Sequence, residues 1–185
     1  MVIIGITGTI GAGKGTIVDY MIENYGFHHY SVRQFLAEEA EKRELPLNRD
    51  SYVTIANDLR AKYAPSYIVD QLCKKAIITG KNAVIESIRT PGEITSLRKH
   101  KNFYLLAIDA NPKIRYNRIV ERNTETDKIS YQTFLENEQR EMTSADPNKQ
   151  NLSKCIAEAD FKLQNDSNFE ELYITLQHII NQINK

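Results

Sequence analysis

Cysteine is scarce in this sequence, which contains Cys73 and Cys155 and no other. One pair cannot build a disulfide framework, and we expect each thiol to be reduced and buried as a small side chain. The histidines, at positions 28, 29, 100 and 178, do not cluster with the cysteines at metal-ligand spacing. The sequence therefore indicates neither a disulfide-rich scaffold nor a Cys/His metal site.

Net charge and long apolar runs are also lacking. The 24 basic and 24 acidic residues cancel to a formal net charge of zero, which argues against non-specific binding to nucleic acid. No apolar run is long enough to span a bilayer. The first one has no basic flank and breaks at a glycine loop, unlike a signal peptide. We therefore expect a cytoplasmic protein, a monomer or weak homodimer, whose partners are small molecules rather than nucleic acid or membrane.

What the chain does have is an alternation of short apolar runs with longer helical patterns, which is typical of βαβ units. Its 185 residues are enough for a domain with a full core. We expect strands at 2–6, 27–31, 83–86, 103–108 and 160–163. We expect helices near 14–24, 31–43, 49–63, 66–79, 112–122, 131–142 and 168–183. This order predicts an α/β fold over residues 1–185, with three layers and a five-stranded parallel sheet flanked by helices.

The strongest motif follows the first strand, where the sequence reads GTIGAGKGT from residue 8 to residue 16. Glycines allow many backbone N–H groups to converge on one phosphate, and the helix that follows adds its own N–H groups. Lys14 supplies a mobile positive charge for the terminal phosphates. We expect ATP to be bound by Gly8, Gly11, Ala12, Gly13, Lys14, Gly15 and Thr16. A glycine-rich turn without ligand is the alternative.

This loop resembles the phosphate loop (P-loop) of nucleoside monophosphate kinases, in which lysine, glycine and threonine follow one another. The usual motif places a hydroxyl residue directly after the lysine to ligate magnesium. Here that position is Gly15, and the hydroxyl comes at Thr16. The later pattern, ESIRTPGEI, DANPKIRYNRIVER and EADFKLQND, resembles dephospho-CoA kinases and a related group of archaeal nucleotide-kinase-like proteins. The resemblance extends over nearly the whole chain and implies a P-loop small-molecule kinase.

The third strand ends in Glu86, with Arg89 following it. An acid at the end of a strand, as in a Walker B element, can hold magnesium directly or through water. The resemblance implies that Glu86 and Thr16 serve the metal and that Glu86 and Arg89 help bind the acceptor. The alternative is a turn with an exposed ion pair.

Further acceptor residues are expected after the second strand. Arg33 opens the next helix, and its planar guanidinium suits bidentate contact with a phosphate. Ser31 is either the helix cap or part of the pocket wall, and Arg60 is another pocket candidate. The long helical stretch 32–80 would form this acceptor region.

After the fourth strand, Arg115, Arg118 and Arg122 follow at spacings of three and four, and so share one helical face. The resemblance implies that Arg118 and Arg122 close on the transferring phosphoryl group, together with Lys14 and Arg89. The polar segment 123–150 is either a lid, from which Arg140 would reach the phosphates, or a solvated face. The alternative for these arginines is pairing with Glu121, Glu125 or Asp127. Asn165 borders the adenine or is a turn residue.

These residues imply transfer of the γ-phosphoryl group of Mg-ATP to a small phosphorylated acceptor, namely a nucleoside or deoxynucleoside monophosphate. The sequence departs from dephospho-CoA kinases at Gly15 and at the YSVR segment after the second strand. Dephospho-CoA remains an alternative acceptor, and it would need a general base for its hydroxyl group. A nucleotide-binding regulatory domain without turnover is an alternative of another class. No Asn-Lys-x-Asp motif follows the fourth strand, which argues against a GTPase switch.

Overall fold

The sheet is all-parallel and five-stranded, with the order β2-β3-β1-β4-β5. The structure is a computed structural model that describes residues 1–124 and 128–184. The strands are β1 (Ile3–Gly8), β2 (His28–Ser31), β3 (Ala83–Glu86), β4 (Phe103–Asp109) and β5 (Phe161–Gln164). The predicted fold class is therefore confirmed. β1 runs to Gly8 instead of ending at residue 6, because its pairing with β4 continues that far.

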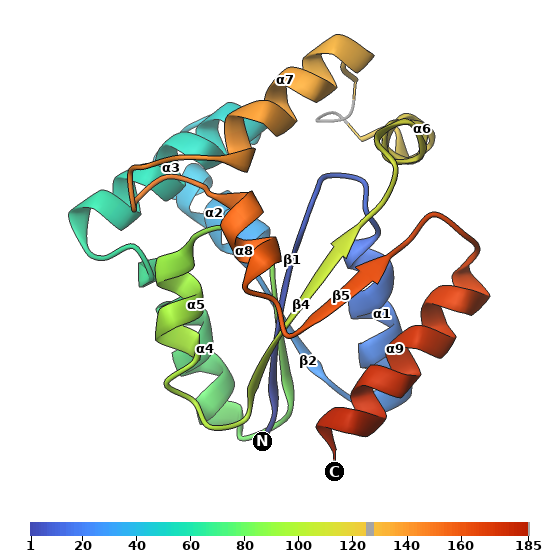
Figure 1. Ribbon diagram of the computed structural model, residues 1–185. Coiled ribbons are helices and arrows are strands. Elements are labelled where there is room, and N and C mark those ends of the chain that lie inside the picture. The colour runs from blue at the N-terminus through green and yellow to red at the C-terminus, as the bar shows by residue number, and fades with distance from the viewer. Residues whose placement is uncertain (125–127, 185) are drawn as a thin grey trace.

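Helices fill the connections between the strands (Figure 1). They are α1 (Lys14–Tyr25), α2 (Val32–Lys42), α3 (Arg49–Lys62), α4 (Tyr67–Thr79), α5 (Pro91–Leu97), α6 (Pro112–Arg122), α7 (Tyr131–Met142), α8 (Leu152–Ala157) and α9 (Phe169–Ile183). α5 and α8 were not predicted from the sequence. Both are too short to show a clear helical period. α5 is fixed instead by its N-terminal cap, where Thr90 and Glu93 form a capping box around Pro91.

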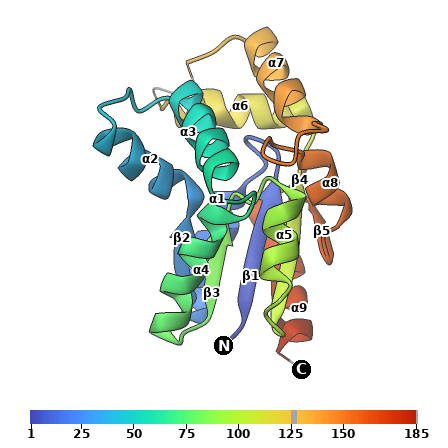
Figure 2. The ribbon, with the colours of Figure 1, turned by 90° about the vertical axis from the view of Figure 1, so that its left-hand side faces the viewer.

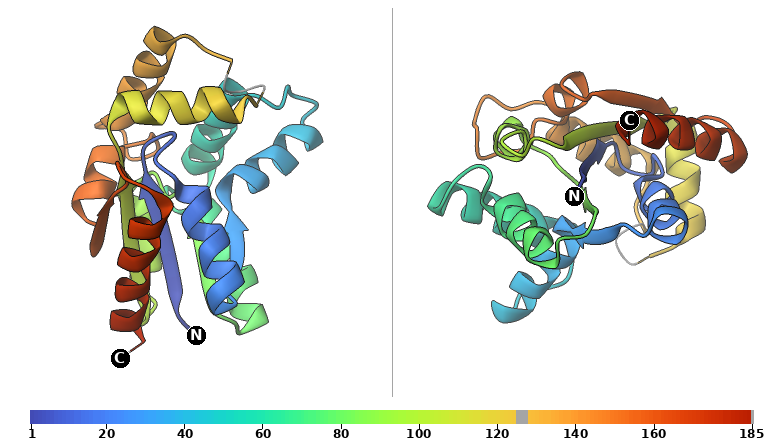
Figure 3. Two further views of the ribbon diagram at one scale, coloured as in Figure 1. Left: turned by 90° about the vertical axis from the view of Figure 1, so that its right-hand side faces the viewer. Right: turned by 90° about the horizontal axis from the view of Figure 1, so that it is seen from below.

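The hydrophobic core lies on both faces of the sheet, as its alternating side chains require. Ile3 of β1 and Ile85 of β3 belong to one cluster, with residues of α2, α3, α4, α5 and α8. Ile4 of β1 and Val84 of β3 belong to the other cluster, with residues of α1 and α9. Figure 3 shows α1 and α9 side by side on their face of the sheet. The three-layer expectation is therefore met.

The carboxyl edge of the sheet is where the chain differs most from a minimal α/β fold. All strands run the same way, so the loops after β1, β3 and β4 emerge together at this edge. α6 and α7 lie above it, and α3 approaches α7 from the side (Figure 2). The two chain ends lie at the opposite end of the molecule (Figure 1). In the described part of the chain, no helix is long and apolar enough to cross a membrane.

Candidate phosphoryl-transfer site

The phosphate loop joins β1 to α1 and leaves the start of α1 open to a ligand. Gly13 precedes the helix with a φ of 103°, a backbone conformation that favours glycine. No side chain of the described residues caps this helix, so its first N–H groups and the positive end of its dipole are available to an anion. Lys14 lies back over the loop, donating hydrogen bonds to the carbonyls of Gly8 at 3.0 Å and Thr9 at 2.8 Å.

The surroundings of Lys14 are unfavourable for its charge. Burial and the nearby positive charge of Arg89 lower the pKa of the Lys14 ammonium to about 7. The Glu86 carboxylate acts in the opposite direction, but with a smaller effect. A bound polyphosphate would therefore supply the negative charge that the surroundings of Lys14 lack.

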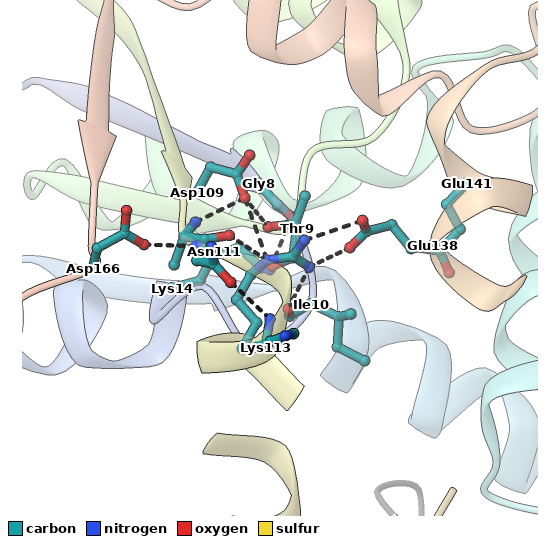
Figure 4. A network of polar contacts seen from close by, with 12 residues as sticks. Gly8, Thr9, Ile10, Lys14, Asp109, Asn111, Lys113, Glu138, Glu141 and Asp166 are labelled. Carbon is teal, nitrogen blue, oxygen red and sulfur yellow. Dashed lines mark hydrogen bonds and ion pairs between the residues drawn. The ribbon is translucent and has the colours of Figure 1, made fainter. Parts of the chain in front are cut away.

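The loop is held from outside by residues far along the chain. Arg115 of α6 donates to the carbonyls of Ala110 at 2.7 Å and Ile10 at 3.2 Å, and pairs with Glu138 of α7. On the other side, Asn165 Nδ2 donates to the Ala12 carbonyl at 2.8 Å. Figure 4 shows Ile10 of the loop and Glu138 of α7 joined through this network. The loop and α7 are thus connected through one arginine.

The acid at the end of β4 also supports the loop. Asp109 accepts hydrogen bonds from Thr9 Oγ1 at 2.5 Å and from the Ala110 N–H at 2.8 Å (Figure 4). The loop backbone also passes close to α6, because a Cβ on Gly11 would lie 2.5 Å from the Arg115 carbonyl oxygen. Asp109 and Arg115 are therefore structural supports of the phosphate loop.

Glu86 ends β3 beside the loop and is held by a neighbouring strand. Its Oε2 lies 3.2 Å from Nε2 of His29 in β2. Burial opposes ionisation of this carboxyl group, but the hydrogen bond to His29 and the charges of Lys14 and Arg89 lower its pKa. The next residue, Ser87, has a φ of 73°, which is uncommon for a non-glycine residue and turns the chain sharply after the strand.

A cavity of about 180 Å³ opens next to Lys14 and Glu86, between α2, α3 and the segment after β3. Its described lining is rich in positive charge: Lys14, Arg33, Arg49, Arg60, Arg89 and Arg122. The carboxylates in the same lining are Glu86 and Glu141. Its apolar wall consists of Val32, Leu36, Tyr52, Val53 and Ala56. The excess of cations suits a ligand with several negative charges, and the apolar wall suits an uncharged portion of the same ligand.

Arg60 lies at the base of this cavity in a buried ion pair. Its side chain is 1% exposed, and Nη2 donates to Glu93 Oε1 at 2.8 Å. The other oxygen of Glu93 accepts from the backbone N–H groups of Arg89 and Thr90. Arg60 Nη1 is buried and has no hydrogen-bond partner among the described residues. One donor of this arginine thus remains for a ligand.

Several arginines of the expected site meet at the cavity. Arg89 and Arg60 line it, as do Arg33 and Arg122, whose side chains are more exposed. Arg118 is half-buried outside the lining, with Nη1 buried and unpaired among the described residues. Arg140 lies at the surface and pairs with Asp50 of α3 at 3.3 Å.

The remaining expected residues have local positions. Thr16 lies in the first turn of α1, close in sequence to Lys14. Ser31 caps α2 by accepting a hydrogen bond from the Gln34 N–H at 3.2 Å, which is the first of its two expected roles; its contact with an acceptor stays a prediction. Residues 125–127, within the expected lid, lie outside the described residues, and so do the proposed partners Glu125 and Asp127.

Three polar residues beside Arg89 were not predicted from the sequence. Glu141 of α7 accepts hydrogen bonds from Arg49 at 2.5 Å and from Arg89, and Gln150 Oε1 accepts from Arg89 at 3.0 Å. Arg49 begins α3, and 92 positions separate it from Glu141. No local pattern links residues so far apart. The available signal was only that Arg49, directly after the capping residue Asn48, begins a helix in the acceptor region.

The fold occurs in known kinases. A shikimate kinase from Bacteroides thetaiotaomicron aligns with a TM-score of 0.61 and 11% identity, covering 100% of this chain and 99% of that one. A protein from Thermus thermophilus aligns with a TM-score of 0.63 and 19% identity, covering 98% of this chain and 97% of that one. At these identities the comparison establishes the P-loop kinase-like fold alone.

Sequence comparison identifies the family. Residues 4–144 match the model of the AAA domain, which covers the phosphate loop and the cavity-lining segments as far as α7. The UPF0200 protein of Methanocaldococcus jannaschii is 30% identical over 191 aligned residues, which cover 99% of this chain and 91% of that protein. The chain is therefore a member of the UPF0200 family and carries an AAA domain with a P-loop kinase-like fold.

Proposed function

We propose that this protein transfers the γ-phosphoryl group of Mg-ATP to a small acceptor that already carries a phosphate, namely a nucleoside or deoxynucleoside monophosphate. The observation that supports this most is the position of the cationic cavity, whose lining contains Lys14 of the phosphate loop. A donor bound at the loop and an acceptor bound in the cavity would place their phosphates side by side. Phosphoryl transfer depends mainly on such positioning and on neutralising the charge of the transition state.

The roles follow from the two sides of the site. The loop N–H groups and Lys14 hold the β- and γ-phosphates, while Arg33, Arg60 and Arg89 hold the acceptor. Arg118 and Arg122, at the last turns of α6, neutralise charge on the group in transit. The segment 123–150, which includes α7, acts as a lid that excludes water and so limits wasteful hydrolysis.

The residues available for magnesium fit a hard cation. Glu86 offers a carboxylate that stays ionised at neutral pH, and Thr16 offers a hydroxyl group on the first turn of α1. Mg²⁺ is typically held by one or two such oxygen ligands, together with substrate phosphates and water. When bound there, it would neutralise charge on the β- and γ-phosphates.

The nature of the cavity carboxylates favours a phosphate as acceptor group. A hydroxyl acceptor, as in dephospho-CoA, needs a base to take its proton. Glu86 is engaged with His29, and Glu141 is engaged with Arg49 and Arg89. A monophosphate is already an anion and does not need such a base.

The test is a panel of acceptors. The protein is incubated with Mg-ATP and nucleoside monophosphates, deoxynucleotides or dephospho-CoA, and ADP is measured. We expect a monophosphate to raise ADP formation well above the rate without acceptor. Lys14→Ala should reduce transfer by orders of magnitude with folding intact, as judged by circular dichroism.

Three results would contradict the proposal. Binding of ATP with no acceptor that raises ADP formation would indicate a regulatory nucleotide-binding domain. Equal activity in Lys14→Ala would show that the loop does not carry the chemistry. Turnover with dephospho-CoA alone would assign the acceptor to the alternative class.

A further inference from the structure

A carboxylate of the chain itself occupies the arginine-rich side of the cavity. Glu141 lies near the end of α7 and is 4% exposed. Its Oε1 accepts a hydrogen bond from Arg49 Nη2 at 2.5 Å, and its Oε2 accepts from Arg89 Nη1. Arg49 belongs to α3 and Arg89 follows β3, and both line the cavity. Two guanidinium groups from separate elements thus converge on one anionic group.

Such convergence is typical of a site for a multivalent oxyanion, because guanidinium groups match the oxygens of carboxylates and phosphates. Glu141 does not use all the donors. Arg49 Nε is buried and has no hydrogen-bond partner among the described residues. A phosphate monoester has three acceptor oxygens and more charge than a carboxylate. It can therefore engage a donor that the two oxygens of Glu141 leave unpaired.

Glu141 is able to act as a competitor because it is ionised. Burial alone would raise its pKa, but the charges of Arg89 and Arg49 and their hydrogen bonds lower it. The same contact ties α7 to the acceptor side of the molecule. The neighbouring pair between Arg140 and Asp50 is exposed and contributes little to this attachment.

We propose that Arg49 and Arg89 form the binding site for the acceptor's phosphate, and that Glu141 occupies it as a displaceable stand-in. Entry of the phosphate expels the Glu141 carboxylate and releases the end of α7 from α3. Arg49 and Arg89 then exchange an internal anion for an external one. Neither arginine is without an anionic partner in either state. This inference rests on the proposed function for the identity of the anion as an acceptor phosphate.

The experiment titrates the full chain and matched variants with inorganic phosphate. Calorimetry measures the affinity of each for phosphate. Glu141→Gln keeps an oxygen acceptor but removes the competing charge. We expect this variant to bind phosphate about tenfold more tightly. In the unmodified protein, phosphate must first break a charge-assisted hydrogen bond to Glu141, and this cost weakens its binding by about a factor of ten. Glu136→Gln is the matched control, because Glu136 lies on the same helix but is exposed and accepts a hydrogen bond from Gln132 of that helix. Its phosphate affinity should equal that of the unmodified protein.

Phosphate also has the open start of α1 as a possible site, so the gain must be traced to Arg49. In an Arg49→Met background, Glu141→Gln should bring no gain in affinity. A gain that persists there would locate the effect at the loop and overturn the proposal. Unchanged or weaker binding in Glu141→Gln alone would also overturn it, because Glu141 would then organise the arginines instead of competing for them.

A second measurement needs no variant. Hydrogen exchange in residues 131–142 should accelerate when phosphate binds to the unmodified protein, and no acceleration would overturn the proposal. None of these readouts requires turnover. If phosphate binds as expected while no acceptor raises ADP formation, the arginine site stands and the kinase proposal fails. If the protein is an active kinase but Glu141→Gln leaves the KM for the acceptor unchanged, the proposed function is supported. The proposal that Glu141 occupies the acceptor's phosphate site is then contradicted.

Discussion

Lys14 shows how a single residue can report on occupancy of the donor site. With its pKa lowered to about 7 by burial, its amine is mostly neutral at pH 8 in the ligand-free protein. A polyphosphate beside it favours the charged form and raises this pKa. We therefore expect ATP binding at pH 8 to take up a proton at Lys14. Calorimetry in buffers of different ionisation enthalpy measures this uptake directly.

The same pKa makes stability depend on pH in a defined direction. Between about pH 7 and the ordinary lysine pKa of about 10.4, the unfolded chain binds more protons at this residue than the folded one. The contribution of Lys14 to the free energy of unfolding therefore rises with pH across that window. Lys14→Met should abolish both this slope and the proton uptake. Uptake that persists in the variant would assign it to another group.

Gly13 and Gly15 lie two positions apart in the loop and should respond in opposite ways to alanine. Gly13 has a φ of 103°, and a Cβ there would lie 2.5 Å from Asn165 Nδ2. We expect Gly13→Ala to cost about 1–3 kcal/mol. A Cβ on Gly15 would meet nothing within 4 Å, and Gly15 is helical, so Gly15→Ala should stabilise by about 0.5–1 kcal/mol. Urea denaturation compares the two, and equal changes would contradict this account of the loop.

Among the elements, α5 depends on one buried acid. Glu93 is fully buried, pairs with Arg60, and accepts the backbone N–H groups of Arg89 and Thr90. Glu93→Ala leaves the Arg60 guanidinium buried without its partner and removes the cap. We expect a loss of about 3–5 kcal/mol in the free energy of unfolding. Chemical denaturation measures it. Glu93→Gln, which retains an oxygen acceptor but loses the charge, should lose less, and equal losses would show that a neutral acceptor contributes nothing here.

The length and the hydrophobic pattern of an element decided whether it could be predicted from the sequence. The central strands β1, β3 and β4 could be predicted because each is a buried apolar run bounded by a turn. α5 and α8 could not be, since their stability comes from caps and from packing against the sheet rather than from a repeated pattern. Within α6, the even spacing of Arg115, Arg118 and Arg122 concealed a difference. Arg115 is buried against the loop, whereas Arg122 lies at the cavity.

In the whole molecule, sequence reasoning reached the loop and missed the partners that complete the cavity. Lys14 and its glycines are contiguous, so a local motif identifies them. Arg49 and Glu141, which were not predicted, meet the predicted Arg89 only because the chain returns twice to the carboxyl edge of the sheet. Their contact distances depend on the three-dimensional arrangement of α3, α7 and β3, which spacing along the chain does not encode. The expected lid at 123–150 stays a prediction.

The contacts of the loop with Arg115 and Asn165 have a consequence for biosynthesis. The glycines and lysine of the loop leave the ribosome well before their outer supports. Arg115 follows its partner Ile10 by 105 positions, and Asn165 follows its partner Ala12 by 153. Contacts of such long range form late. A nascent chain arrested before residue 165 has emerged should therefore fail to capture a photoreactive ATP analogue, whereas the released chain captures it. Labelling of the arrested chain would show that the loop can form without its supports. Nucleotide would thus be unavailable as a folding aid until Asn165 has emerged.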